Sequence, residues 1–233
     1  MIRILSALLA LAAYAAPAAA EQRRFSVTDF DRVIVEGPFV VHLVVGRTSS
    51  ATVTGSREAI DRVTVDSQGR LLRIRRNRNA WGGTPGADVG PVAIALEARS
   101  LRSARLIGPA RLQIDGAEGL NVEFSVEGSG SLRATGVEAE NLSLALLGSG
   151  RLDIAGATRR LRASFQGTGD VEAANLRARD ATVATTTVGS VTLTVDGPVT
   201  VNAGGLGEVA ILGRPICTLR GTGAGQVRCS NQR

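Results

Sequence analysis

The chain has 233 residues, of which 44% are hydrophobic and 3% aromatic, and its formal net charge at pH 7 is +6. The chain contains arginine but no lysine, so a phosphate-binding loop that depends on lysine is excluded. The single histidine likewise excludes a histidine-rich metal site. We interpret the arginine-only composition, with its abundant alanine and glycine, as GC-rich codon usage. We expect neither a nucleic-acid partner nor a cofactor.

The first 20 residues have the layout of a secretory signal peptide. An arginine precedes an apolar run from Ile4 to about Ala15, and a proline and three alanines follow before Glu21. A positive start, a short hydrophobic run and an A-x-A cleavage site are typical of exported proteins. We predict cleavage after Ala20 and a mature protein, residues 21–233, in the periplasm or outside the cell. No later segment is long enough to be a transmembrane helix.

A repeat of about 20 residues runs through the second half of the chain. Gly-x-Gly corners recur, and their second position is occupied in turn by Ala110, Gly130, Gly150, Gly169, Gly189, Gly207 and Gly225. Apolar residues stand two and four positions after each corner, with polar or small residues between them. This alternation predicts short strands in successive coils, each of which buries its inner face only by stacking on its neighbours.

The repeat predicts an all-β protein folded as a parallel β-solenoid, β-helix-like, with coils of about 20 residues. A right-handed coil is expected from the preference of parallel crossovers. A β-sandwich is the alternative, because short strands joined by glycine turns also occur there. We interpret the paired glycines as tight corners that let one wall approach the opposite wall closely, and not as a phosphate-binding loop.

The mature chain is expected to form a single domain with two parts. Residues 106–233 carry the regular Gly-x-Gly coils, whereas residues 25–105 are strand-rich and lack the repeat. Within the first part, residues 30–46 alternate in polarity around a Gly-Pro pair, and residues 69–77 have the pattern of another strand. Residues 77–91 contain four glycines and two prolines and are predicted to be a loop.

Two cysteines, Cys217 and Cys229, lie in the last coil, in columns expected to point inward. In an exported protein a close pair of this kind typically forms a disulfide. Neither a C-x-x-C motif nor a grouping of cysteine with histidine predicts a metal site. We predict a disulfide that closes the exposed end of the stack.

Several stretches together resemble the GIN domain, a family of autotransporter-adhesin head domains. They are the opening FDRVIVEGPFVVHLVVG, the strand LLRI, the repeats EGSGSL, LGSGRL and QGTGDV, and the closing GLGEVAILGRPICTLRGTGAGQV. The resemblance covers about residues 25–229 and implies an exported β-helix-like fold with an adhesive or ligand-binding role. It supplies no catalytic residues. Two corners, at residues 108–110 and 187–190, depart from the repeat without altering the expected fold.

One candidate ligand-binding site is the basic stretch around Arg73, Arg75, Arg78 and Trp81. Arginines beside an aromatic ring bind anionic groups or sugars through paired hydrogen bonds and stacking. The alternative is an edge strand protected from aggregation by its charges, with Trp81 packing the loop down.

A second candidate is an acidic outer wall formed by Asp153, Asp170 and Glu172, which the repeat places on adjacent coils. Stacked carboxylates can act as acid and nucleophile in the cleavage of a polysaccharide. The alternative is a surface charge ladder in which Arg133 lies beside Asp153 and Arg151 beside Asp170.

The sequence thus predicts an exported binding or structural module of the cell envelope, adhesin-like and without catalytic activity. Its expected partner is an envelope or extracellular polysaccharide, or another surface protein. The alternative is a carbohydrate-active β-solenoid enzyme that uses the acidic wall, and a third possibility is assembly through an exposed end of the stack.

His42 lies on an alternating strand and is interpreted as structural, and no nucleophile elbow is present.

Overall fold

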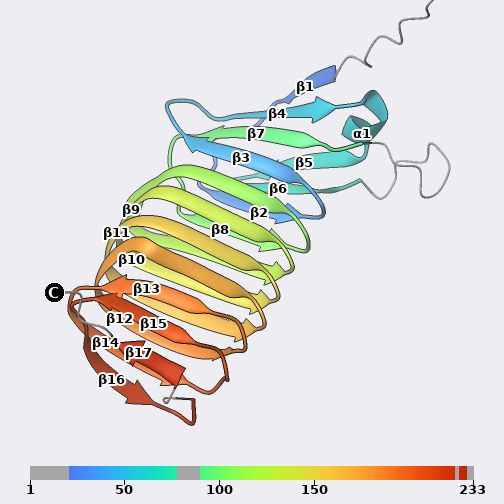
Figure 1. The fold of residues 1–233 in the computed structure, drawn as a ribbon. Helices are drawn as coiled ribbons and strands as arrows, with labels where there is room; N and C mark the ends of the chain where they lie inside the picture. Colours follow the sequence, from blue (N-terminus) through green and yellow to red (C-terminus); the bar gives the residue numbers. More distant parts are fainter. Residues whose placement is uncertain (1–20, 78–89, 224–225, 230–233) are drawn as a thin grey trace, which may run out of the picture.

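The computed structural model describes residues 21–77, 90–223 and 226–229. Strands account for 72% of the structure and form a β-solenoid of about six turns with coils of about 20 residues (Figure 1). The predicted fold class is confirmed, and the β-sandwich alternative is wrong. The predicted signal peptide, residues 1–20, lies outside the described residues.

Each of the four central coils is one long strand that bends around a corner. These strands are β9 (Arg111–Gly128), β10 (Ser131–Gly148), β11 (Arg151–Gly167) and β12 (Asp170–Thr187). They pair in parallel, so that Leu112, Leu132, Leu152 and Val171 lie side by side. The columns predicted from the repeat are therefore the columns of the structure.

The later coils are each divided into two shorter strands. One wall continues through β13 (Val191–Val195), β15 (Val209–Gly213) and β17 (Val227–Cys229), and the other through β14 (Pro198–Ala203) and β16 (Ile216–Arg220). β13 pairs with the first half of β12, and β14 pairs with its second half. The two walls thus continue to the end of the stack.

The core consists of the inward side chains between the two walls. In a typical coil, Leu152 and Ile154 are buried on one wall, and Leu161 and Phe165 are buried on the other. Because each of these side chains lies between the coil before it and the coil after it, stacking removes it from water. Full burial of one such side chain contributes about 1.5–3 kcal/mol.

The glycine corners are explained by contact between successive coils. Gly148 has a φ of +120°, which favours glycine, and a Cβ atom at Gly150 would lie only 2.5 Å from the Gly130 carbonyl oxygen. The same Cβ would lie 2.8 Å from the Val126 side chain in the core. The expected close approach is therefore real, but it is to the preceding coil and not to the opposite wall.

The first part of the chain builds its coils in a different order. β2 (Arg32–Glu36) and β3 (Val40–Val45) form one coil, and β7 (Ala93–Ala98) and β8 (Ser103–Ile107) form another. In one wall β3 lies between β7 and β9, whereas in the other wall β8 lies between β2 and β9. The two coils are therefore interleaved. The first coil contacts β9 through β3 in one wall, and the second coil contacts β9 through β8 in the other.

The N-terminal end of the stack is closed by antiparallel strands. β4 (Ser50–Gly55) pairs with β7 and with β1 (Glu21–Phe25), and β5 (Val63–Gln68) pairs with β6 (Leu71–Arg76). Between β4 and β5 lies the short helix α1 (Arg57–Asp61), which was not predicted from the sequence. Its first turn is capped by the Ser56 hydroxyl, which accepts a hydrogen bond from the Ala59 N–H.

The C-terminal end of the stack carries the predicted disulfide. Cys217 on β16 and Cys229 on β17 are bonded to each other. Cys217 is aligned with Val199 of the coil before it, and Cys229 with Ile211. The disulfide therefore joins the two walls across the last coil, as expected for an end cap.

Candidate ligand-binding surfaces

A groove of about 880 Å³ crosses the coils at the corner where the long strands bend. The bend is visible in the pairing of β10 with β11, whose register shifts between Ala134 and Val137. Three-residue segments of successive coils line the groove, at 138–140, 157–159, 177–179 and 196–198, and Arg214 completes it. We call this surface the corner groove.

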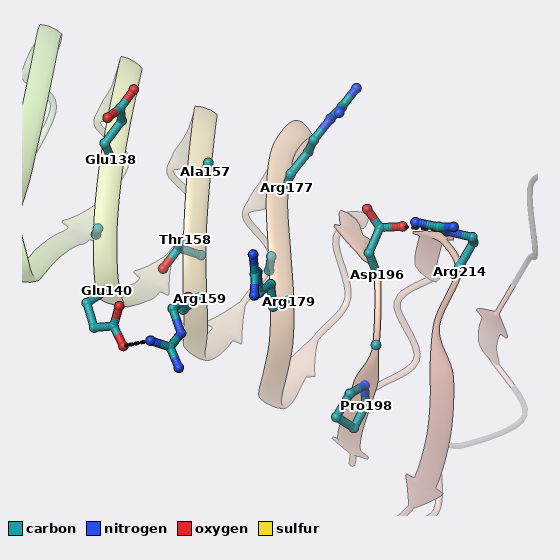
Figure 2. Close-up of a pocket in the computed structure, with 13 residues that line it drawn as sticks. Glu138, Glu140, Ala157, Thr158, Arg159, Arg177, Arg179, Asp196, Pro198 and Arg214 are labelled. Carbon is teal, nitrogen blue, oxygen red and sulfur yellow. Dashed lines mark hydrogen bonds and ion pairs between the residues drawn. The ribbon is translucent and has the colours of Figure 1, made fainter.

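Small side chains form the floor of the corner groove, and charged side chains form its two sides. Ala139, Thr158 and Ala178 are aligned across the three long strands, and the last two are buried. Figure 2 shows the charged residues on either side of this floor, with Glu138 and Arg177 in one row and Glu140, Arg159 and Arg179 in the other. The groove therefore runs parallel to the solenoid axis.

The charges along the corner groove are unevenly compensated. Glu140 forms an ion pair with Arg159, in which Oε1 lies 2.8 Å from NH1, and Asp196 lies 3.5 Å from Arg214 Nε. Arg177 and Arg179 are exposed and have no ion pair or side-chain hydrogen bond within the described part of the chain. These two guanidinium groups are available for an anionic ligand.

The basic stretch predicted as a ligand site is only partly described. Arg73 and Arg75 lie on β6, where Arg75 forms two hydrogen bonds to Asp66 Oδ2, at 3.1 and 2.9 Å. Arg73 Nε lies 3.6 Å from Glu36 Oε1. Arg78 and Trp81, with most of the predicted loop, fall outside the described residues.

The edge-strand alternative for this basic stretch is wrong. β6 lies between β2 and β5 and is hydrogen-bonded on both sides, so its backbone groups need no protection by charge. Beside it, a groove of about 750 Å³ is lined by Arg73, Arg75 and Arg76 and by Gly108 and Pro109 of the first glycine corner. The structure thus brings the two described arginines of the candidate site to the rim of a groove, with acidic partners already in place.

The three carboxylates of the predicted acidic wall lie on adjacent coils, as expected. Asp153 is aligned with Glu172 on β12, and Asp170 is aligned with Arg151 on β11. Arg133 binds Asp153 Oδ2 through Nε at 2.9 Å and through NH2 at 2.6 Å. Glu172 accepts a hydrogen bond from the backbone N–H of Ala174. The contact between Arg133 and Asp153 is one of the two pairs of the alternative charge ladder, whereas Arg151 is aligned with Asp170 without forming an ion pair among the described residues.

Asp170 is further tied to the next coil. The backbone N–H and the hydroxyl of Ser190 both donate to Asp170 Oδ1, each at 2.8 Å, and they hold the pKa of this carboxyl below its ordinary value. A carboxyl with a lowered pKa is ionised at neutral pH and has no proton to give to a leaving group. Asp170 is therefore unsuited to the role of general acid.

His42 lies on β3, on the same wall as these carboxylates, and is aligned with Gln113 of β9. Its Nε2 is 2.5 Å from Asp115 Oδ2, so the contact joins β3 to β9. The hydrogen bond from His42 is the largest cause of a lowered pKa at the Asp115 carboxyl. The structural role expected for His42 is consistent with this contact between two coils.

The described residues contain no group of three or more His, Cys, Asp or Glu side chains placed to hold a metal ion. In the same residues no helix has the length and apolarity needed to cross a membrane.

Arg177 and Arg179 were not predicted as site residues from the sequence. The predicted columns are those two and four positions after each corner, whereas these arginines stand eight and ten positions after Gly169. Extending the same columns across the bend aligns Arg177 with Ala157 and Glu138. The position of these arginines therefore follows the repeat, but the register shift at the bend means that their distance in sequence from the corner differs between coils.

Solved structures with the same fold are named as adhesins or as a binding protein. A putative adhesin from Bacteroides fragilis superposes with a TM-score of 0.81 at 16% identity, covering 92% of this chain and 97% of that one. A putative lipid binding protein from Parabacteroides distasonis has a TM-score of 0.69 at 18% identity, with coverages of 91% and 97%. A putative adhesin from the same organism has a TM-score of 0.64 at 18% identity, with coverages of 91% and 95%.

No curated protein matches the chain in sequence. A family model does match it, over residues 29–215, and its description is "putative auto-transporter adhesin, head GIN domain". The matched region begins just before β2 and ends just before β16, so it contains both the interleaved coils and the regular ones. The resemblance noted in the sequence is confirmed, and the chain belongs to the GIN-domain family of adhesin heads.

Proposed function

We propose that this protein is an exported, adhesin-like binding module that holds an anionic polymer, such as an acidic envelope or extracellular polysaccharide, along the corner groove. The observation that carries the proposal is the pair Arg177 and Arg179, which are exposed on one coil of the groove without acidic partners in the described part of the chain. Their charges favour an anion, and the groove gives that anion a direction along the solenoid.

The geometry of a solenoid suits a repeating ligand. Successive coils are about 4.8 Å apart, so a polymer lying along the groove meets equivalent backbone positions at regular intervals. The small floor residues Ala139 and Ala178 let an extended chain lie close to the backbone. The groove volume of about 880 Å³ is within the usual range for ligand sites.

Family membership and the disulfide support the location and the class of function. GIN domains are described as adhesin heads, and a disulfide such as Cys217–Cys229 persists in oxidising compartments outside the cytoplasm. The N-terminal pattern of residues 1–20 agrees with export. One structure of the same fold is named as a lipid binding protein, so anionic lipid is included among the ligands to be tested.

Two other surfaces are weaker candidates. Arg73 and Arg75 remain a prediction as a second ligand surface, and their pairing with Glu36 and Asp66 lowers the charge they offer. The carbohydrate-active alternative is less well supported, because Asp153 is held by Arg133 and Asp170 is kept ionised by Ser190. Binding without cleavage is the function that these contacts favour.

The test is a binding screen of the purified protein against acidic polysaccharides, neutral polysaccharides and anionic lipid vesicles. The variant Arg177→Ala/Arg179→Ala should weaken binding of the acidic polysaccharide by tenfold or more, because each charge-assisted hydrogen bond contributes about 1.5–3 kcal/mol. Binding by the wild type should also fall as salt is raised.

A matched control removes the same charge elsewhere. Arg23 and Arg62 form ion pairs with Asp61 and Glu58 at the N-terminal end of the stack, so Arg23→Ala/Arg62→Ala should leave binding unchanged. An Arg73→Ala/Arg75→Ala variant tests the second surface in parallel. Equal affinity of the wild type and the groove variant for every ligand would exclude the corner groove as the binding site, and cleavage of a polysaccharide would favour the enzyme alternative.

A further inference from the structure

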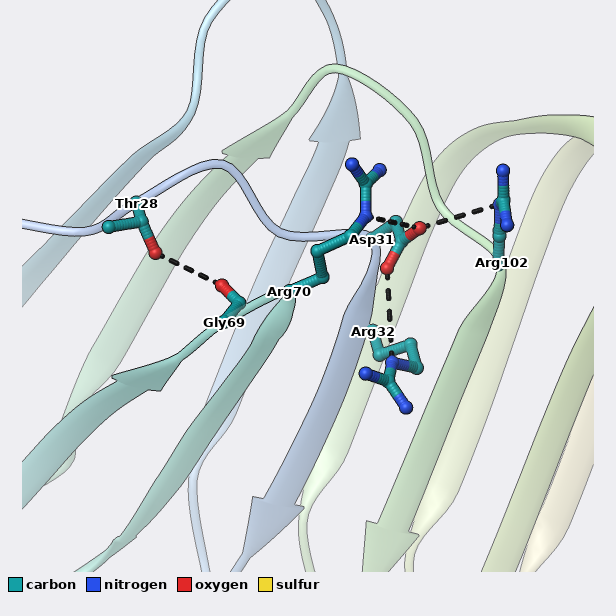
Figure 3. Close-up of polar contacts among 6 residues, drawn as sticks. All are labelled: Thr28, Asp31, Arg32, Gly69, Arg70 and Arg102. Atoms are coloured by element: carbon teal, nitrogen blue, oxygen red, sulfur yellow. Dashed lines mark hydrogen bonds and ion pairs between the residues drawn. The ribbon is translucent and has the colours of Figure 1, made fainter.

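A buried carboxylate surrounded by arginines lies near the N-terminal end of the solenoid, and none of these residues lines the corner groove. Asp31 immediately precedes β2 and is only 3% exposed. Three arginines approach it from three segments, namely Arg32 of β2, Arg70 of the turn before β6 and Arg102 before β8 (Figure 3). Three positive charges around one negative charge leave a local excess of two.

The arginines contact Asp31 through Nε and leave their outer nitrogens unused. Arg70 Nε lies 2.9 Å from Asp31 Oδ2, Arg102 Nε lies 3.4 Å from the same oxygen, and Arg32 Nε lies 3.9 Å from Oδ1. Within the described residues, no side-chain partner is found for NH1 or NH2 of any of the three. These side chains are 57–71% exposed, so their outer nitrogens can reach a ligand from solvent.

The backbone holds two of these arginines in place. The Asp31 N–H donates to the Arg70 carbonyl at 3.1 Å, and the Arg102 N–H donates to the Asp31 carbonyl at 2.8 Å. The Thr28 hydroxyl donates to the Gly69 carbonyl at 3.1 Å and so fixes the turn that carries Arg70. Figure 3 shows Arg70 and Arg102 flanking the Asp31 carboxylate, with Arg32 on its other side.

We propose that Arg70 and Arg102, positioned by Asp31, form a binding site for a phosphate group. A phosphate monoester carries a charge of about −1.5 to −2 at neutral pH, and the local excess of about +2, which includes Arg32, attracts such a group. Guanidinium groups with free outer nitrogens bind phosphate oxygens through paired hydrogen bonds. Asp31 is a positioning residue, because its carboxylate accepts a hydrogen bond from Arg70 Nε and lies 3.4 Å from Arg102 Nε, so that both guanidinium groups approach it through their inner nitrogen.

Isothermal titration of the purified protein with inorganic phosphate tests this site, with sulfate and chloride at equal ionic strength as controls for specificity. Arg70→Gln/Arg102→Gln should weaken phosphate binding by about a hundredfold, and Arg102→Gln alone by about tenfold, since each charge-assisted bond is lost separately. Arg102 is 71% exposed, so this single variant keeps the proposal testable if the double variant fails to fold. Arg23→Gln/Arg62→Gln, with the same loss of charge, should bind phosphate as the wild type does.

Two further arms identify the source of the phosphate group. A soluble sugar phosphate and vesicles containing phosphatidic acid present the same group on a glycan and on a lipid surface. If Arg102→Gln weakens binding of either probe, the site is supported, and the probe affected shows whether the phosphate group belongs to a glycan or to a lipid. The proposal is overturned if the wild type binds none of the three probes, if chloride competes equally with phosphate, or if Arg102→Gln binds as tightly as the wild type. Because the corner-groove variants leave this site intact, its failure is separate from that of the proposed function.

Discussion

The regular coils and the interleaved coils reach the same solenoid walls by different routes. From β9 to β17 each coil stacks on the coil that precedes it in the chain, so neighbours in sequence are neighbours in space. Before β9, β3 and β8 both contact β9 although more than 50 residues separate them. A sequence repeat is needed only where every coil packs against an equivalent coil. In the first part of the chain the neighbouring strands differ from coil to coil, so no repeat is required there.

The two parts also differ in what fixes the approach of their strands. In the regular coils, the absence of a side chain at positions such as Gly150 lets each corner rest on the carbonyl of the coil before. In the interleaved part, Asp31 joins three segments through its side chain and its backbone. The comparison suggests that the regular coils depend on steric fit and the interleaved coils on a polar cluster.

The largest expected effect is on steric fit. Gly150→Ala places a Cβ atom 2.5 Å from the Gly130 carbonyl oxygen, a contact that only a shift of one coil against the other can relieve. We expect it to lower the free energy of unfolding by about 3 kcal/mol, the upper end of the usual cost of overpacking. Chemical denaturation measures this change.

A glycine outside the regular coils supplies the control. Gly69, in the turn between β5 and β6, has a φ of +59°, and a Cβ atom added there would meet no atom within 4 Å. Gly69→Ala should therefore cost only the strain of the left-handed conformation, about 1–2 kcal/mol. If both substitutions cost the same, close contact between coils is not the reason that the corners require glycine.

The next effect concerns the end of the regular stack. Cys217→Ser/Cys229→Ser opens the link between the two walls, and loss of a disulfide that closes so short a loop should cost about 2 kcal/mol. Because each coil of a solenoid contacts only its neighbours, the loss should be local. Hydrogen exchange should quicken in β15 and β16 and remain slow in β2 and β3. Uniform loss of protection along the chain would mean that the two parts unfold as one unit.

The polar cluster should respond less strongly. Asp31→Asn keeps the shape of the side chain and removes the charge that three arginines share, and we expect a loss of about 1–2 kcal/mol because those arginines are more than half exposed. Asp153→Asn in the regular coils removes a single partner, Arg133, and should cost under about 1 kcal/mol. Thermal unfolding of both variants compares them directly, and a larger loss for Asp153→Asn would contradict the contrast between the two parts.

The sequence was informative where the repeat is strict. The register of Leu132 with Leu152, the inward columns and the Cys217–Cys229 bond all follow from a period that the residues themselves display. The interleaving of β3 with β7 and β9 could not be predicted in this way, because it depends on long-range pairing between segments that share no pattern.

The candidate sites follow the same rule. The adjacency of Asp153 and Glu172 follows directly from the repeat, and the alignment brings them together as predicted. The corner groove was missed because the register shift at the bend interrupts the period, which hides Arg177 and Arg179 from a fixed spacing. The Asp31 cluster was missed because its arginines come from three segments without a common motif.

The smallest expected effect lies at the boundary between the two parts, where His42 of β3 contacts Asp115 of β9. This hydrogen bond, with those from Thr135 and Gln113, lowers the pKa of Asp115 from its ordinary value of 3.8. A carboxyl with a lowered pKa in the folded state stabilises the protein above its unfolded pKa, and this contribution is lost as the pH falls through the folded pKa. Asp115→Asn should therefore lower stability at pH 6 by under about 1 kcal/mol, since both side chains are substantially exposed, and the wild type and the variant should converge near pH 2. Denaturation at a series of pH values measures the difference, and a gap that stays constant down to pH 2 would show that the difference does not come from ionisation of Asp115.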